Sequence, residues 1–187
     1  MHEFFRPFIV NAYHSPGILD LRFGIFLPPV YQYGRPKLLN FATMGTTLGH
    51  ELGHEIEAFM EEVENYDNDT CRIYKEKKKC LVEQYSEFQI KKIGKKIITR
   101  FLLRGNFSLP ALNFTTEQLL YISLAQMWCS VSSWEKEQLH YELDIHAPSD
   151  IRIIGMLRNL REFSNAFNCP RGSRMNPAER CAFRLRS

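Results

Sequence analysis

One five-residue segment contains the side chains best suited to chemistry, His50-Glu51-Leu52-Gly53-His54. On a helix, positions four apart lie on one face, so both imidazoles can reach the same ion. Zinc accepts neutral imidazole nitrogens, and it lowers the pKa of water, whose proton a neighbouring carboxylate can take. The spacing predicts a zinc site of the metallopeptidase type, with His50 and His54 as ligands and Glu51 as general base. The alternative is a pair of partly exposed histidines on an acidic helix.

The helix that must position this motif is predicted over residues 41–65. Its apolar residues recur at spacings of three and four and so share one face, namely Leu48, Leu52, Ile56, Phe59 and Val63. The two histidines project away from this stripe, so we expect the apolar face to be buried and the histidines to meet a cleft. Three glycines, Gly45, Gly49 and Gly53, also follow each other at a spacing of four. Because glycine lowers helix stability, we expect another helix to pack closely against them.

Further elements are predicted on both sides of this helix. Residues 8–13 and 20–26 favour two strands, with a turn over 14–17 between them. After the histidine motif, we expect a loop or solvated helix at 67–79 and a basic amphipathic helix at 88–104. Three further helices are predicted: one capped by Thr115 or Thr116 that reaches about Cys129, one capped by Ser149 or Asp150, and a last one at 160–167. We therefore expect an α+β fold, mainly helical, with a small edge sheet beside the histidine-bearing helix.

Composition limits the classes of protein to which the chain can belong. It has 187 residues, of which 44% are hydrophobic and 24% charged, so we expect one globular domain or a piece of one. No apolar run is long enough for a membrane span, and no signal peptide is predicted. The net charge of +3 does not require an acidic partner. A solvated surface is the preferred interpretation of the basic face at 91–104, and nucleic-acid or membrane-surface binding is the alternative.

Cysteines and glycosylation acceptors favour a secreted or lumenal setting. Five cysteines stand at long spacings without a CxxC pair, which argues against a structural zinc ribbon. The acceptor motif N-x-S/T begins at Asn68, Asn106 and Asn113, and three such motifs together with five cysteines predict a glycoprotein.

Short segments in a fixed order carry a second line of evidence. They are V-N-A-Y at 10–13, L-G-H-E-L-G-H at 48–54, C-L-V-E-Q-Y at 80–85, A-Q-M-W-C at 125–129, D-I-H-A-P at 144–148, F-S-N-A-F-N-C at 163–169 and M-N-P at 175–177. In this order they resemble the C-terminal part of the neprilysin and endothelin-converting-enzyme family of zinc metallopeptidases, the M13 peptidases. The resemblance implies that residues 1–187 are a single zincin-like (thermolysin-like) catalytic-domain fragment, incomplete because the N-terminal lobe is absent.

The resemblance also implies roles for residues outside the histidine motif. Asn11 and Ala12 would present main chain and an amide to a short peptide substrate, which adds as a strand. His146 would donate a hydrogen bond to the oxyanion that forms during peptide-bond hydrolysis. Asp144 would orient this histidine, and Arg152 would hold a substrate carbonyl or carboxylate.

Cysteine pairing and location follow from the same resemblance. Cys80 and Cys181 are implied to form a disulfide, and Cys71 is an extra cysteine. Cys129 and Cys169 would pair with cysteines of the absent part, unless they join each other. The family implies a secreted protein or the extracellular face of a membrane, with the absent lobe or a partner chain completing the cleft.

The third zinc ligand is the main departure from the family. The family takes it from the glutamate of a G-E-N-I-A-D segment, and no such segment stands here. Glu87 is the candidate that takes its place if the chain is shortened just before it. Lys91 would then replace the supporting aspartate, and a cation cannot accept a histidine N–H. After His54, the sequence Glu55-Ile56-Glu57 also replaces the usual G-F-D.

Two functional hypotheses from different classes follow. In the first, the chain is a zinc metalloendopeptidase domain that binds one Zn²⁺ through His50, His54 and Glu87. In the second, it is a catalytically inactive homologue that binds peptides or partners, and a truncated gene product is a variant of this hypothesis. A nucleic-acid binder using the basic face at 91–104 is a third and weaker interpretation, and we expect no nucleic-acid partner.

Overall fold

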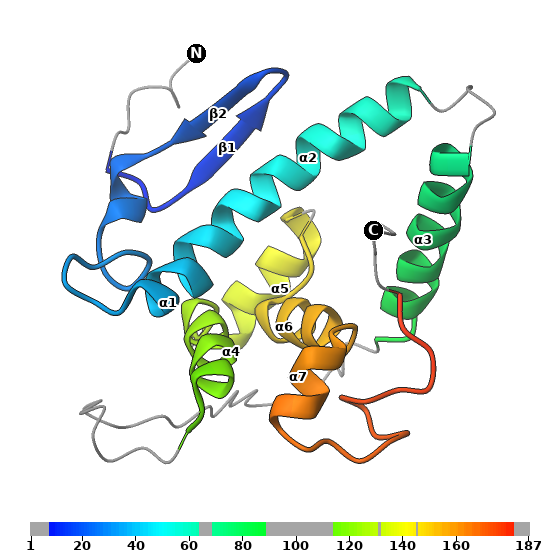
Figure 1. The fold of residues 1–187 in the computed structure, drawn as a ribbon. Coiled ribbons are helices and arrows are strands. Elements are labelled where there is room, and N and C mark those ends of the chain that lie inside the picture. Colours follow the sequence, from blue (N-terminus) through cyan, green and yellow to red (C-terminus); the bar gives the residue numbers. More distant parts are fainter. Residues whose placement is uncertain (1–7, 64–68, 89–113, 131, 145, 182–187) are drawn as a thin grey trace. The chain divides into compact units, whose positions relative to one another are not determined.

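A computed structural model describes residues 8–63, 69–88, 114–130, 132–144 and 146–181 (Figure 1). It contains two compact units, one formed by residues 1–76 with 119–127 and the other by residues 77–118 with 128–187. Helices dominate, and the described strands form one two-stranded sheet. The predicted α+β, mainly helical class is therefore confirmed. Among the described residues, no helix is both long enough and apolar enough to cross a membrane.

A short hairpin opens the first unit. Strand β1 (Ala12–Ser15) pairs antiparallel with β2 (Ile18–Leu21), so that Ala12 lies opposite Leu21. The predicted strand bounds were wrong, because the turn is a two-residue loop at 16–17, with Gly17 at φ +72°, so the strands extend into residues 14–15 and 18–19. Residues 23–26 form a 3₁₀ helix in place of a strand. A side chain at Gly24 would collide with the backbone of Ile9, so the chain passes itself closely here.

A helical run follows the hairpin and carries the histidine motif. It comprises α1 (Lys37–Asn40), a π-helical turn at Phe41–Gly45 and α2 (Thr46–Glu62), and β1 runs beside α2 (Figure 1). The core of this unit contains the buried residues Ala12, Ile25 and Val30, with Leu21, Met44 and Met127 packed against them.

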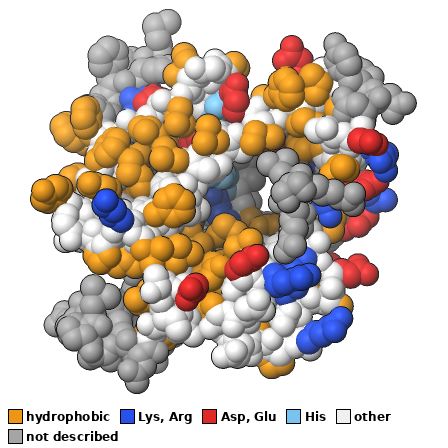
Figure 2. Space-filling model, in the orientation of Figure 1, with side chains coloured by type: hydrophobic (Ala, Val, Ile, Leu, Met, Phe, Trp, Pro, Cys, Tyr) orange, Lys and Arg blue, Asp and Glu red, His pale blue; other side chains and the backbone are white. Residues whose placement is uncertain are grey.

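The predicted apolar stripe of α2 is not buried. Leu52, Ile56 and Phe59 are 54%, 59% and 58% exposed, and hydrophobic side chains are visible at the molecular surface in Figure 2. Outside the backbone of α2 itself, no described atom lies within 4 Å of a Cβ atom placed at Gly49 or Gly53, so the predicted close helix packing is absent there among the described residues. Helical periodicity showed which residues share a face, but the buried residues of α2 are Glu51 and Met60.

The remaining helices complete both units. They are α3 (Asp69–Ser86) and α4 (Thr116–Met127), which each contribute to both units, and α5 (Trp134–Leu143), α6 (Ser149–Leu157) and α7 (Arg161–Ala166) of the second unit. Thr115 caps α4 as predicted, because its hydroxyl accepts from the Gln118 amide at 3.2 Å and the Gln118 side chain accepts from the Thr115 amide at 3.0 Å. Pro148 stands at the N-cap of α6, and neither Ser149 nor Asp150 caps it. The sequence did not predict α5.

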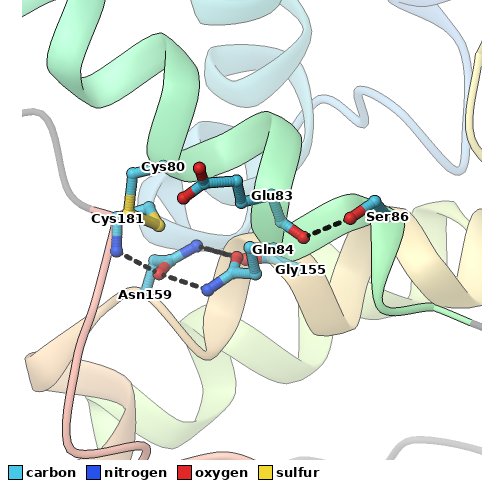
Figure 3. The surroundings of a disulfide bond; sticks show 7 residues. All are labelled: Cys80, Glu83, Gln84, Ser86, Gly155, Asn159 and Cys181. Carbon is cyan, nitrogen blue, oxygen red and sulfur yellow. Dashed lines mark hydrogen bonds between the residues drawn. A yellow bond between two sulfur atoms is a disulfide. The ribbon is translucent and has the colours of Figure 1, made fainter.

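A disulfide between Cys80 and Cys181 joins α3 to the C-terminal segment of the second unit, as the family resemblance implied (Figure 3). Beside it, the buried Asn159 side chain accepts from the Cys181 backbone amide at 2.8 Å and donates to the Gly155 carbonyl at 2.8 Å. Cys129 and Cys169 are free, and the buried Cys71 thiol donates to the Val63 carbonyl at 3.4 Å. Cys129 and Cys169 therefore do not join each other.

Candidate metal and peptide site

The residues predicted to form the site divide between the two units. The first unit contains Asn11, Ala12, His50, Glu51 and His54, and the second contains Glu87, Asp144, His146 and Arg152. Each group has its own local geometry.

His50 and His54 lie one turn apart on α2. Their Nε2 atoms are 3.2 Å apart, and their rings meet edge to face with centroids 4.7 Å apart. Two nitrogens that each bind one zinc ion at about 2.0–2.1 Å in tetrahedral geometry lie roughly 3.3 Å from each other. The observed separation therefore fits a shared metal ion, and it also allows an N–H···N hydrogen bond between the rings.

Glu51 follows His50 and is buried, with 7% of the residue exposed, although His50 itself is exposed. A helix turns about 100° per residue, which places Glu51 on the face of α2 next to that of His50. A carboxylate shielded from bulk water beside an accessible imidazole is suited to work as a general base.

Strand β1 carries the residues implied to bind a peptide. Asn11 is exposed just before the strand, its carbonyl accepts from the Arg22 amide at 3.3 Å and its side chain accepts from the Ala12 amide at 3.0 Å. Ala12 is buried in the core cluster. Ala12 thus anchors the start of β1 in the core, and Asn11 just before it is exposed.

Next to this strand lies a pair that the sequence analysis missed. His14 was predicted in a turn, but it lies on β1 and its Nε2 hydrogen-bonds the Glu55 carboxylate on α2. The His14 ring lies 6.2 Å from the His54 ring between centroids. Two hydrogen bonds hold the pKa of the Glu55 carboxyl below its usual value; the one from His14 has the larger effect and the one from the Gly17 amide the smaller. The one signal in the sequence for this pair was Glu55 itself, which departs from the G-F-D that usually follows the second histidine in the family that the chain resembles.

In the second unit, Asp144 is bound by two histidines. Its Oδ1 accepts from the His146 backbone amide at 2.8 Å and contacts His146 Nδ1 at 2.6 Å, while Oδ2 lies 3.2 Å from His140 Nδ1. The bond from the His146 amide is the main reason why the pKa of Asp144 lies below its usual value. The implied Asp144–His146 contact is present, and His140, at the end of α5, is an additional partner that the sequence analysis missed.

Arg152 on α6 is held from two sides within the same unit. Its Nε donates to the Ala147 carbonyl at 2.7 Å, and its guanidinium carbon lies 4.6 Å from the centroid of the Trp128 ring. Burial lowers the pKa of Arg152, and burial also raises the pKa of the Tyr85 hydroxyl, which the nearby charge of Arg152 opposes. The guanidinium is thus oriented before any ligand arrives.

Glu87 lies in the turn after α3 with an exposed side chain. Its assignment as third metal ligand remains a prediction. Lys91, the basic face at 91–104 and the acceptors Asn68, Asn106 and Asn113 lie outside the described residues.

Comparison with known proteins gives matches along most of the chain. The model of peptidase family M13 matches residues 11–108 and 103–183. An endothelin-converting enzyme homolog of Locusta migratoria is 36% identical and human endothelin-converting enzyme 1 is 35% identical, each over 94% of this chain. The chain spans 28% and 27% of their lengths.

Two solved structures share the fold. A zinc metalloprotease of Mycobacterium tuberculosis in an open state superposes with a TM-score of 0.71 at 23% identity, covering 97% of this chain and 34% of its own. A galactose-containing glycoprotein complex of Haemonchus gives a TM-score of 0.73 at 27% identity, with 94% and 35% covered. The fold is therefore that of a part of these larger chains.

Proposed function

Because the chain belongs to peptidase family M13, we propose that it binds one zinc ion through His50 and His54 and hydrolyses peptide bonds of short peptides. The observation that carries this proposal is the 3.2 Å separation of the two Nε2 atoms beside the buried Glu51 carboxylate. A zinc ion bound there would lower the pKa of a water molecule and polarise the scissile carbonyl group.

The side chains of the protein account for the proton and charge movements. Glu51 takes the proton of the attacking water and returns it to the leaving amine. His146 donates a hydrogen bond to the developing oxyanion, and Asp144 fixes the orientation of that imidazole through Nδ1. Arg152 binds a substrate carbonyl or carboxylate, and the exposed Asn11 side chain at β1 binds the peptide main chain.

The third protein ligand is proposed to be Glu87. Catalytic zinc sites of this type use three protein ligands and keep one position open. Two neutral imidazoles leave the charge of the dication uncompensated, so a carboxylate is the expected third ligand. Glu87 is the acidic residue that follows the Cys80–Tyr85 segment at the point where the family's sequence and this one diverge.

A second candidate function is peptide binding without catalysis. It is favoured by the missing G-E-N-I-A-D segment and by the exposure of Glu87 in a turn rather than on a helix. In that case the chain retains the Asn11 and Arg152 contacts to a peptide and holds zinc weakly or not at all.

Metal analysis of the purified chain separates the two candidates. After dialysis against micromolar zinc, the peptidase proposal expects one zinc per chain and cleavage of a short fluorogenic peptide. Glu51→Gln should abolish cleavage with zinc retained, whereas Glu62→Gln, at an exposed glutamate of the same helix, should leave both unchanged. Zinc well below one per chain, or full cleavage by Glu51→Gln, contradicts the peptidase proposal.

The setting of the protein is proposed from the same family relationship. A secreted or extracellular location suits the Cys80–Cys181 disulfide and the glycosylation acceptors of the sequence. The chain spans only 27–28% of the relatives it matches, so we propose that an additional lobe or partner chain takes part in substrate binding.

A further inference from the structure

The Glu55 carboxylate is a meeting point between the hairpin and the histidine-bearing helix. It accepts a hydrogen bond from His14 on β1, and the backbone amide of Gly17 in the hairpin loop lies 3.4 Å from the same oxygen. One carboxylate oxygen therefore contacts both the strand and the turn that follows it. The His14 side chain is only 13% exposed, so this contact lies on the inner face of the hairpin.

The inner face of the hairpin is attached to the rest of the first unit near its open end and again near its loop. Side chains two positions apart on a strand point to the same side, so Ala12 and His14 both face inward. Ala12 is buried in the apolar core cluster near the start of β1. His14 and Glu55 form the second attachment, near the loop, where the outward-facing Tyr13 and Ile18 are 37% and 64% exposed.

The second attachment matters because the hairpin is small. Each strand has four residues, and a two-stranded hairpin of this length is marginally stable in water unless it packs on another element. Ala12 and its cross-strand partner Leu21 pack on the core only at the open end of the hairpin, so without a contact near the loop the distal half can still tilt. A contact near the loop fixes the direction of β1 along α2.

We propose that His14 and Glu55 form a positioning pair that aligns strand β1 with the helix bearing His50 and His54, and thereby sets the affinity for an extended peptide. This inference rests on the proposed function for its peptide part only. Glu55 directly follows His54 in the sequence, so the pair connects β1 to the helical turn that carries the second histidine. Its effect is on the placement of the strand, and metal binding by α2 should not depend on it.

Hydrogen exchange of the hairpin tests the pair without requiring activity. In His14→Ala and in Glu55→Gln, the cross-strand amides of residues 12–21 should exchange about two- to fivefold faster, as expected for the loss of one partly exposed side-chain pair. The double variant should exchange no faster than either single variant, because one interaction is lost in all three. Glu62→Gln is the matched control on α2 and should match wild type. Unchanged exchange in both single variants overturns the proposal.

Peptide affinity, measured with a non-cleavable phosphinic peptide at equal zinc content, tests the functional part. Both single variants should bind it about two- to fivefold more weakly than wild type, with unchanged zinc per chain. Faster exchange with unchanged peptide affinity overturns the positioning role. Zinc binding without peptide binding in wild type overturns the peptide part, and the exchange data then show separately whether the pair anchors the hairpin.

Discussion

The side chains of Gln84 and Asn159 form a reciprocal amide pair in the interior of the second unit. Gln84 Nε2 donates to Asn159 Oδ1 at 3.2 Å, and Asn159 Nδ2 donates to Gln84 Oε1 at 2.7 Å (Figure 3). Each residue is 8% exposed. The pair joins α3 to the turn that follows α6, next to the Cys80–Cys181 disulfide.

Asn159→Ala should therefore lower the free energy of unfolding by about 2–6 kcal/mol. It leaves the buried Gln84 amide and the Cys181 backbone amide without their partner, and each unsatisfied buried group costs about 1–3 kcal/mol. Urea denaturation followed by circular dichroism measures the change. Asn165→Ala, at an exposed asparagine of α7, is the control and should change stability by less than about 0.5 kcal/mol. Equal stability of the two variants would contradict the role of the pair.

The disulfide predicts a second stability effect. It links residues 101 positions apart. The chain-entropy model assigns about 4–5 kcal/mol of folding stability to a disulfide that closes a loop of this length, and measured effects are often smaller. Cys80→Ser with Cys181→Ser should thus lower the denaturation midpoint clearly. Cys129→Ser, at an exposed free cysteine, should not. A double variant as stable as wild type would show that the bond is not formed in the protein studied.

The position of the metal motif on one helix could be predicted from the sequence, because the i, i+4 spacing of His50 and His54 is a local property. The Thr115 cap is local in the same way. The Cys80–Cys181 pairing came from the family resemblance and not from the residues, since cysteine spacing does not fix connectivity.

Contacts between residues distant in sequence could not be predicted. His14 and Glu55 are 41 positions apart, and neither has a pattern that points to the other. His140 was missed because the apolar residues of α5 form no continuous stripe at helical spacing, so the sequence did not predict a helix there. For the stripe containing Leu52 and Ile56, periodicity identified a shared face correctly, but what covers a face depends on tertiary packing.

Glu87 gives a prediction for metal affinity. If Glu87 is the third ligand, Glu87→Ala should weaken zinc binding by at least about 100-fold, because loss of supporting residues alone costs 10–100-fold. Competition with a chromogenic chelator measures the affinity. Glu83→Ala is the control, since Glu83 is an exposed glutamate one turn earlier on α3. Equal zinc affinity of the two variants would remove Glu87 from the ligand set.

Asp144 gives a prediction for the pH dependence of stability. Hydrogen bonds from the His146 backbone and ring lower its pKa in the folded protein, relative to about 3.9 in an unfolded chain. A lowered folded pKa means that the unfolded state binds the proton more tightly, so the contribution of Asp144 is complete above about pH 4 to 5 and is lost as the pH falls through the folded pKa. The difference in unfolding free energy between wild type and Asp144→Asn should therefore shrink as the pH is lowered from 6 toward 3. Urea denaturation across this range measures it, with Glu62→Gln as the control at an exposed glutamate of α2. A difference that stays constant, or grows toward low pH, would show that the two histidines do not stabilise the charged form of Asp144.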